Sequence, residues 1–215
     1  MTYLQLVNEV LVRLRENEVT TVNQTTYSKL IGKFVNDTKR DVEDAYDWNA
    51  LTDTLTATTS ASLFNYVLTG AGVRFRVLDV INDDSNWFVE PTTRKWMNEQ
   101  FLINSNAPGS PQYYSFNGVD TNGDTQVDLF PIPDGVYNIR FNIIKPQAAL
   151  SSDSTRILVP SEPVIFGAYA KALVERGEDQ GQNSSEAYLL YRKSLGDHVA
   201  IEAARYGDET VWDAL

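Results

Sequence analysis

The 215-residue chain carries 29 acidic and 18 basic residues, a net charge of −11, and contains no cysteine. The lack of cysteine excludes a disulfide scaffold, a thiolate zinc site and a cysteine nucleophile, and the acidic charge argues against tight wrapping of nucleic acid. No apolar run approaches the roughly 18 residues of a membrane helix, so we expect a protein that is made in a cytoplasm and has no membrane partner.

The first 50 residues predict two helices. Thr2 and Gln5 have the spacing of a capping box, and apolar residues then recur at helical spacing to about Arg15. After a polar connector, a second helix is expected over 27–48. Its expected apolar face consists of Leu30, Ile31, Phe34, Val35, Thr38, Val42, Ala45 and Trp48. The expected charged face opposite consists of Lys33, Asp37, Lys39, Arg40, Glu43 and Asp44.

From residue 51 to residue 89 the apolar period changes from helical to alternating, which predicts strands. Ala71-Gly72 is typical of a turn, and we expect a strand pair over 73–81 after it. A short helix is expected near 92–102, capped by Thr92 or Thr93.

Residues 113–116 and 127–130 flank a cluster of glycine, asparagine and aspartate, which predicts a hairpin. A turn over 131–135 then leads to a third strand over 137–145. The acidic loop 120–128 has oxygen ligands at alternate positions, as calcium loops do. Its glycine falls at the fourth position and not the sixth, and Pro131 stands where a bidentate glutamate is needed. We therefore predict a turn that needs no ion.

The C-terminal third predicts two further helices, over 163–176 and 185–205, joined by a linker over 177–184. The second is expected to pack through Ala187, Leu190, Tyr191, Leu195, Val199 and Ala203. The predicted fold class is α+β. Residues 1–50 and 160–205 form a helical bundle, 51–159 form an inserted antiparallel β-rich region, and 206–215 form a C-terminal docking tail.

Catalytic chemistry has little support in the sequence. His198 is the only histidine, and its neighbour Asp197 would not face it on a helix. Acidic pairs such as Glu43 with Asp47, or Asp83 with Asp84, arise by chance among 29 acidic residues. We expect no catalytic residue, no metal and no cofactor. The aromatic clusters Tyr113-Tyr114, Trp87-Phe88 and Tyr188/Tyr191 lack interleaved basic residues, which favours core or subunit contacts over nucleic-acid stacking.

The order of elements resembles the head-tail adaptors of tailed bacteriophages, including the tail tubular A proteins. The resemblance is carried by Phe34 to Thr38 and Tyr46 to Trp48 before a threonine-rich strand, by Pro111 to Tyr114, by the turn Leu129 to Asp134 with Tyr137 beyond it, and by the C-terminal helix pair. The aromatic residues expected as subunit or core anchors are Phe34, Trp48, Tyr113, Tyr114 and Phe130.

The resemblance implies a structural protein of the virion neck and not an enzyme. It implies a ring, normally of twelve copies, that joins the portal protein to tail or nozzle proteins and continues the DNA channel. Neighbouring subunits would be partners, and double-stranded DNA would pass without tight binding. Two alternatives stay open: a tail-associated lytic enzyme, and another neck component such as a stopper or tail terminator.

Charge and tail composition agree with such an assembly. Subunits that each carry −11 would repel DNA phosphate along the channel, and we expect the isolated chain to be monomeric. Val211, Trp212 and Leu215 are expected to dock on the portal or on a neighbouring subunit, and the tail to be mobile before assembly. The alternative is that the tail folds back on its own domain.

Overall fold

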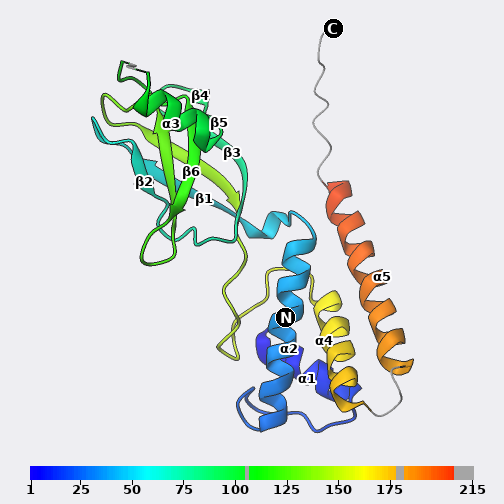
Figure 1. Cartoon of the computed structure of the whole chain (residues 1–215). Coiled ribbons are helices and arrows are strands. Elements are labelled where there is room, and N and C mark those ends of the chain that lie inside the picture. Colours follow the sequence, from blue (N-terminus) through cyan, green and yellow to red (C-terminus); the bar gives the residue numbers. More distant parts are fainter. Residues whose placement is uncertain (105–106, 178–181, 206–215) are drawn as a thin grey trace. The chain divides into compact units, whose positions relative to one another are not determined.

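The computed structural model describes residues 1–104, 107–177 and 182–205. The chain divides into two compact units, one made of Met1–Leu51 with Pro146–Leu215 and one made of Thr52–Lys145. The long helices lie in the first unit and the described strands in the second, so the fold class is α+β (Figure 1). Residues 146–159, which we expected in the β-rich region, belong to the helical unit.

Helix α1 spans Tyr3–Arg13 and begins with the predicted capping box. The Gln5 backbone N–H donates to Thr2 Oγ1 at 3.3 Å, and the Thr2 N–H donates to Gln5 Oε1 at 2.9 Å. These two bonds satisfy N–H groups that have no partner within the helix, so a helix start at this point is stable.

Helix α2 spans Thr26–Ala45 and ends three residues before the predicted Trp48. Tyr46 is in an extended conformation, and the Trp48 indole N–H donates to the carbonyl of Val42 at 2.7 Å. Trp48 thus folds back against the end of α2 and is 2% exposed. The 3-10 helix η1, Asn49–Leu51, follows it.

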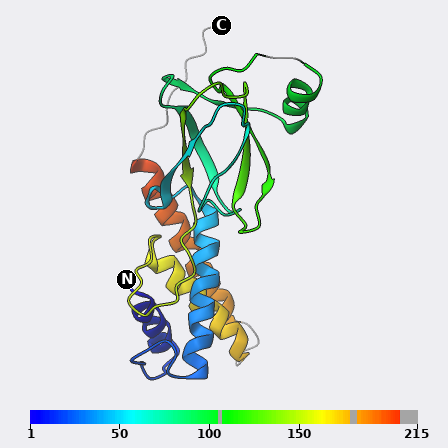
Figure 2. The ribbon, with the colours of Figure 1, turned by 90° about the vertical axis from the view of Figure 1, so that its left-hand side faces the viewer.

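Helices α4 (Ser161–Arg176) and α5 (Gln182–Arg205) complete the first unit. Helix α4 packs against α1, α2 and α5, and Figures 1 and 2 show α2 and α4 side by side. Fully buried aliphatic side chains fill the spaces between α1, α2 and α4, among them Leu6, Val10, Ile31, Val35, Val164 and Ala168.

Two residues of the predicted charged face of α2 are buried, which corrects that prediction. Lys39 Nζ and Glu43 Oε1 lie 2.7 Å apart, and their side chains are 3% and 1% exposed. Both also bind the backbone of Gln147, whose carbonyl accepts from Lys39 at 2.7 Å and whose N–H donates to Glu43 at 3.1 Å. Lys39 follows the buried Val35 by four residues and so lies on the buried stripe of the helix.

The described residues of the second unit form two four-stranded sheets. One has the order β1-β8-β3-β4 and the other β2-β7-β6-β5, and every pairing is antiparallel except β5–β6. The bounds are β1 Thr52–Thr58, β2 Asn65–Val67, β3 Arg76–Asn82, β4 Trp87–Phe88, β5 Glu90–Pro91, β6 Tyr113–Val119, β7 Thr125–Phe130 and β8 Asn138–Ile144. Side chains from both sheets share one core that includes Tyr114, Leu129 and Phe141, and the sheets face each other across it (Figure 2).

The strand region differs from the prediction in two respects. Residues 73–81 form no strand pair, because the single strand β3 covers their second half. Strand β8 does not extend the β6–β7 hairpin but lies in the other sheet between β1 and β3. The hairpin itself is confirmed, as is the short helix α3, Arg94–Leu102, which Thr93 caps.

Candidate interaction groove

Helix α5 buries few of its large apolar side chains. Its buried residues are Ser184, Ala187, Tyr191, Ser194 and Glu202, which include serine, alanine and a carboxylate. By contrast, the exposed fractions of Tyr188, Leu189, Leu190 and Ile201 lie between 51% and 66%. Leu190 and Ala203 were expected on the packed side and are exposed instead. Exposed apolar residues concentrated on one element are a mark of an interaction surface.

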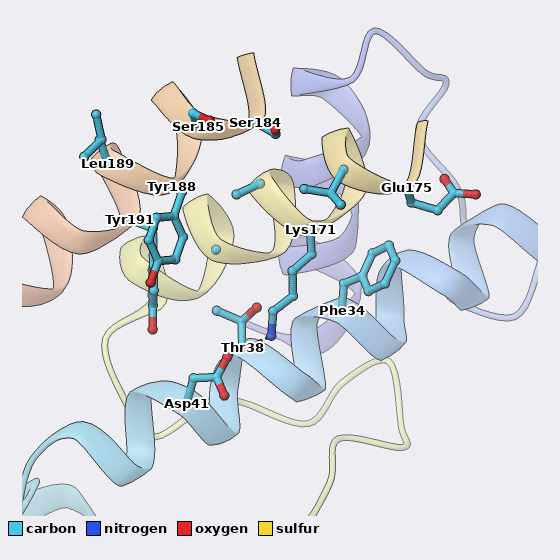
Figure 3. A pocket seen from close by; sticks show the side chains of 13 residues that line it. Phe34, Thr38, Asp41, Lys171, Glu175, Ser184, Ser185, Tyr188, Leu189 and Tyr191 are labelled. Atoms are coloured by element: carbon cyan, nitrogen blue, oxygen red, sulfur yellow. Dashed lines mark hydrogen bonds and ion pairs between the residues drawn. The ribbon is translucent and has the colours of Figure 1, made fainter. Parts of the chain in front are cut away.

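A groove with a volume of 730 Å³ lies between α2, α4 and α5. Phe34 and Thr38 come from α2, Lys171 and Val174 from α4, and Ser184, Tyr188, Leu189 and Tyr191 from α5 (Figure 3). The volume falls within the range of pockets that bind ligands or peptide side chains, and the groove walls are mainly aromatic and aliphatic.

The floor of the groove depends on a glycine of α4. A Cβ atom placed on Gly167 would collide with Thr38 Cγ2 and would lie 3.1 Å from Tyr191 Cδ2. The missing side chain therefore lets α2 and α5 approach α4 closely at this position. The groove opens beside this close contact.

One ion pair lies at the edge of the groove. Lys171 Nζ and Asp41 Oδ2 are 2.8 Å apart, and their side chains are 37% and 53% exposed (Figure 3). Burial raises the pKa of the Tyr191 hydroxyl, and the negative charge of Asp41 raises it further, so this phenol stays neutral at physiological pH. The groove therefore presents an apolar interior with a weakly held ion pair at its rim.

The predicted aromatic anchors do not gather at one place. Phe34 lines the groove, and Trp48 is buried in the helical unit. Tyr114 and Phe130 are buried in the strand unit, where Tyr113 packs against Trp96 with ring centroids 5.0 Å apart. The docking residues Val211, Trp212 and Leu215 lie outside the described residues.

Backbone N–H groups already donate hydrogen bonds to Asp120 and Asp124, two carboxylates of the acidic hairpin. Asp120 Oδ1 accepts from the backbone N–H groups of Asn122 and Asp124 at 2.8 Å each. The N–H groups of Gly70 and Gly72 donate to Asp124 at 2.9 Å, and these two bonds lower the pKa of that carboxyl. Within the described ranges, no group of three or more metal-binding side chains comes together.

The residues examined for acid-base chemistry also have structural partners. His198 Nδ1 lies 2.8 Å from the carbonyl of Ser194, and Asp83 pairs with Arg140. Asp84 accepts the backbone N–H of Asn138 at 2.6 Å, and Glu43 pairs with Lys39. These carboxylates hold the fold together, and the structure does not group them in the groove.

Sequence reasoning missed most of the groove. Lys171, Val174 and Leu189 were not expected at a site, although the run Tyr188-Leu189-Leu190-Tyr191 was a usable signal. A helix buried on one face cannot cover four consecutive large side chains, so some of them must be exposed.

An exposed apolar groove of this kind is a feature of interaction surfaces. Residues 1–211 match the model of the family described as SU10 adaptor protein. The chain belongs to this family of bacteriophage adaptors, which are structural proteins. No curated protein matches the chain.

No helix within the described ranges is long and apolar enough to cross a bilayer.

Proposed function

We propose that this adaptor forms a ring, normally of twelve copies, that joins the portal of a tailed phage to its tail and continues the DNA channel. The observation that carries the proposal is the family match over residues 1–211. The partners would be the portal protein, neighbouring copies and tail or nozzle proteins, at the neck of the virion. We also propose that this adaptor is of the same type as the tail tubular A proteins.

The charge of the chain supports a role around passing DNA. At −11 per copy, a ring would repel phosphate, so the genome could slide through with little adhesion. Double-stranded DNA would therefore be cargo and not a tightly bound ligand.

We also propose that α1, α2, α4 and α5 act as one helical bundle, with the β-rich unit as an insertion. The pairwise packing of α4 with the other three helices supports this division. In the assembly, Val211, Trp212 and Leu215 would supply apolar anchors, since buried tryptophan and leucine carry much of the energy of protein interfaces.

Mass photometry of the portal of the same phage, alone and after mixing with the chain, tests the proposal. The expected mass gain corresponds to twelve copies of 24.2 kDa, and electron cryomicroscopy should show the copies as a ring on one end of the portal. A chain that adds no mass to the portal would overturn the proposal. The deletion Trp212–Leu215 is expected to reduce the mass gain without changing the melting temperature of the free chain.

A further inference from the structure

The groove between α2, α4 and α5 is large, apolar and open, and the same chain contains an apolar segment that could fill it. Val174 and Leu189 at its rim are 68% and 66% exposed. Residues 211–215 contain Val211, Trp212 and Leu215. Leaving these groups in water has a free-energy cost that burial of both surfaces would remove.

We infer that the groove of each copy receives the segment 211–215 of a neighbouring copy. This inference rests on the proposed ring, which brings copies side by side. A ring of identical subunits offers one groove and one such segment per copy, so head-to-tail insertion fills every groove and closes with the ring.

Chain length favours insertion between copies over insertion within one copy. Leu189 lies 16 residues before Arg205 on α5, about 24 Å along the helix axis at the α-helical rise. Trp212 follows Arg205 by seven residues, which span at most about 25 Å when fully extended. For insertion within one copy the chain must reverse at once after Arg205: Trp212 meets Leu189 only when the chain is fully stretched, and Leu215, ten residues after Arg205, spans at most about 36 Å. A neighbouring copy has no such restriction.

Peptide binding to the full-length chain tests the groove without the portal. The probe is a fluorescein-labelled peptide of residues 206–215, followed by fluorescence anisotropy. We expect saturable binding that Leu189→Glu weakens by about tenfold or more, as loss of an interface anchor does. The matched control is Leu190→Glu, which adds the same charge one residue away, at a side chain that is 51% exposed and does not line the groove. It should change the affinity by less than about twofold.

A peptide carrying Trp212→Ser and Leu215→Ser should not bind. Equal binding to the Leu189→Glu and Leu190→Glu variants, or no binding of the natural peptide, would overturn the inference.

Disulfide trapping in the portal-bound ring distinguishes a neighbouring copy from other sources of the segment. The chain has no cysteine, so single cysteines can be placed freely. Chains that carry Ala214→Cys are mixed with chains that carry Val174→Cys before assembly on the portal. Mild oxidation should then give a cross-linked dimer. In the control, Val12→Cys replaces Val174→Cys. Val12 is an exposed residue of α1 that does not line the groove, so this pair should give little dimer.

The remaining outcomes separate this inference from the proposed ring. If a ring of full mass forms but Ala214→Cys with Val174→Cys gives no more dimer than the Val12→Cys control, the inference fails and the ring stands. The inference also fails if a chain that carries both Ala214→Cys and Val174→Cys closes the bond within a free monomer. If no ring forms on the portal, the proposed function fails even where the peptide binds the groove.

Discussion

At the scale of single residues, the pair Lys39–Glu43 shows how a charged position is held inside the helical unit. The two side chains are 3% and 1% exposed, so neither charge is stabilised by bulk water. Each charge is compensated by the other and by one backbone group of Gln147. Removal of one partner leaves a buried charge without its counter-charge, whereas removal of both does not.

The variant Lys39→Met should therefore lower the free energy of unfolding by roughly 3–5 kcal/mol. Adding Glu43→Leu should restore most of this loss, because the buried carboxylate is then also gone. Urea denaturation of both variants measures the effect. Lys171→Met is the control, since the exposed pair Lys171–Asp41 contributes less than about 1 kcal/mol. Similar losses for Lys39→Met and Lys171→Met would contradict the argument.

Asp124 is a second residue whose environment has a measurable consequence. Hydrogen bonds from the N–H groups of Gly70 and Gly72 lower its pKa, so the folded chain binds this proton less readily than the unfolded chain. Its contribution to stability is fully present above the ordinary carboxyl pKa and is lost as the pH falls through the lower folded pKa. Asp124→Asn should reduce the melting temperature at neutral pH, and the difference from the natural chain should shrink in acid. A difference that is constant with pH would rule out this linkage.

At the scale of elements, the contact of α4 with α2 and α5 depends on the absence of a side chain at Gly167. Glycine is a poor helix former, so its presence within α4 calls for a packing reason. That reason is the close approach of Thr38 and Tyr191. Helix α5 buries Ala187, Tyr191 and Ser194, whereas its Leu189 and Leu190 are exposed.

Two glycine-to-alanine substitutions test this explanation. Gly167→Ala should destabilise the chain by about 1–3 kcal/mol, because the new methyl group forces α2 and α5 away from α4. Gly196→Ala in α5 should stabilise it by up to about 1 kcal/mol, because a Cβ there meets nothing within 4 Å and alanine favours the helix. Thermal or urea unfolding of the two variants measures both effects. Stabilisation by both substitutions would show that the contact is not tight.

At the scale of the whole molecule, charge opposes self-association and apolar surface favours it. Each copy carries −11, and the repulsion acts over about a Debye length, close to 8 Å at physiological salt. The exposed side chains of α5 act only on contact. An external template such as the portal would hold copies close enough for these contacts to form.

We therefore predict that the purified chain is largely monomeric, with a mass near 24.2 kDa by light scattering, and that it forms a ring only with the portal. Moderate salt should screen the repulsion and increase weak association without producing a closed ring. A stable dodecamer of the isolated chain at moderate salt would show that the contacts overcome the charge without a template.

Local signals in the sequence predicted local structure correctly. The capping box at Thr2, the cap at Thr93 and the turn chemistry of the β6–β7 hairpin involve residues close in the chain, so their hydrogen bonds are visible in the sequence. The α+β class followed from the change of apolar period at residue 51. The absence of cysteine by itself excluded a disulfide scaffold and a thiolate zinc site, and the acidic charge argued against tight wrapping of nucleic acid.

Only the tertiary structure decided which distant segments meet. Strand β8 lies between β1 and β3, 80 or more residues from its partner in β1, and no local pattern specifies that pairing. Lys39 and Glu43 are buried because the backbone of Gln147, more than 100 residues away, compensates them. The groove is lined by residues from Phe34 to Tyr191, which no local pattern brings together. In each case the interactions that stabilise the arrangement involve a partner far away in the sequence. The residue type alone could therefore not predict which segments pair or which side chains are buried.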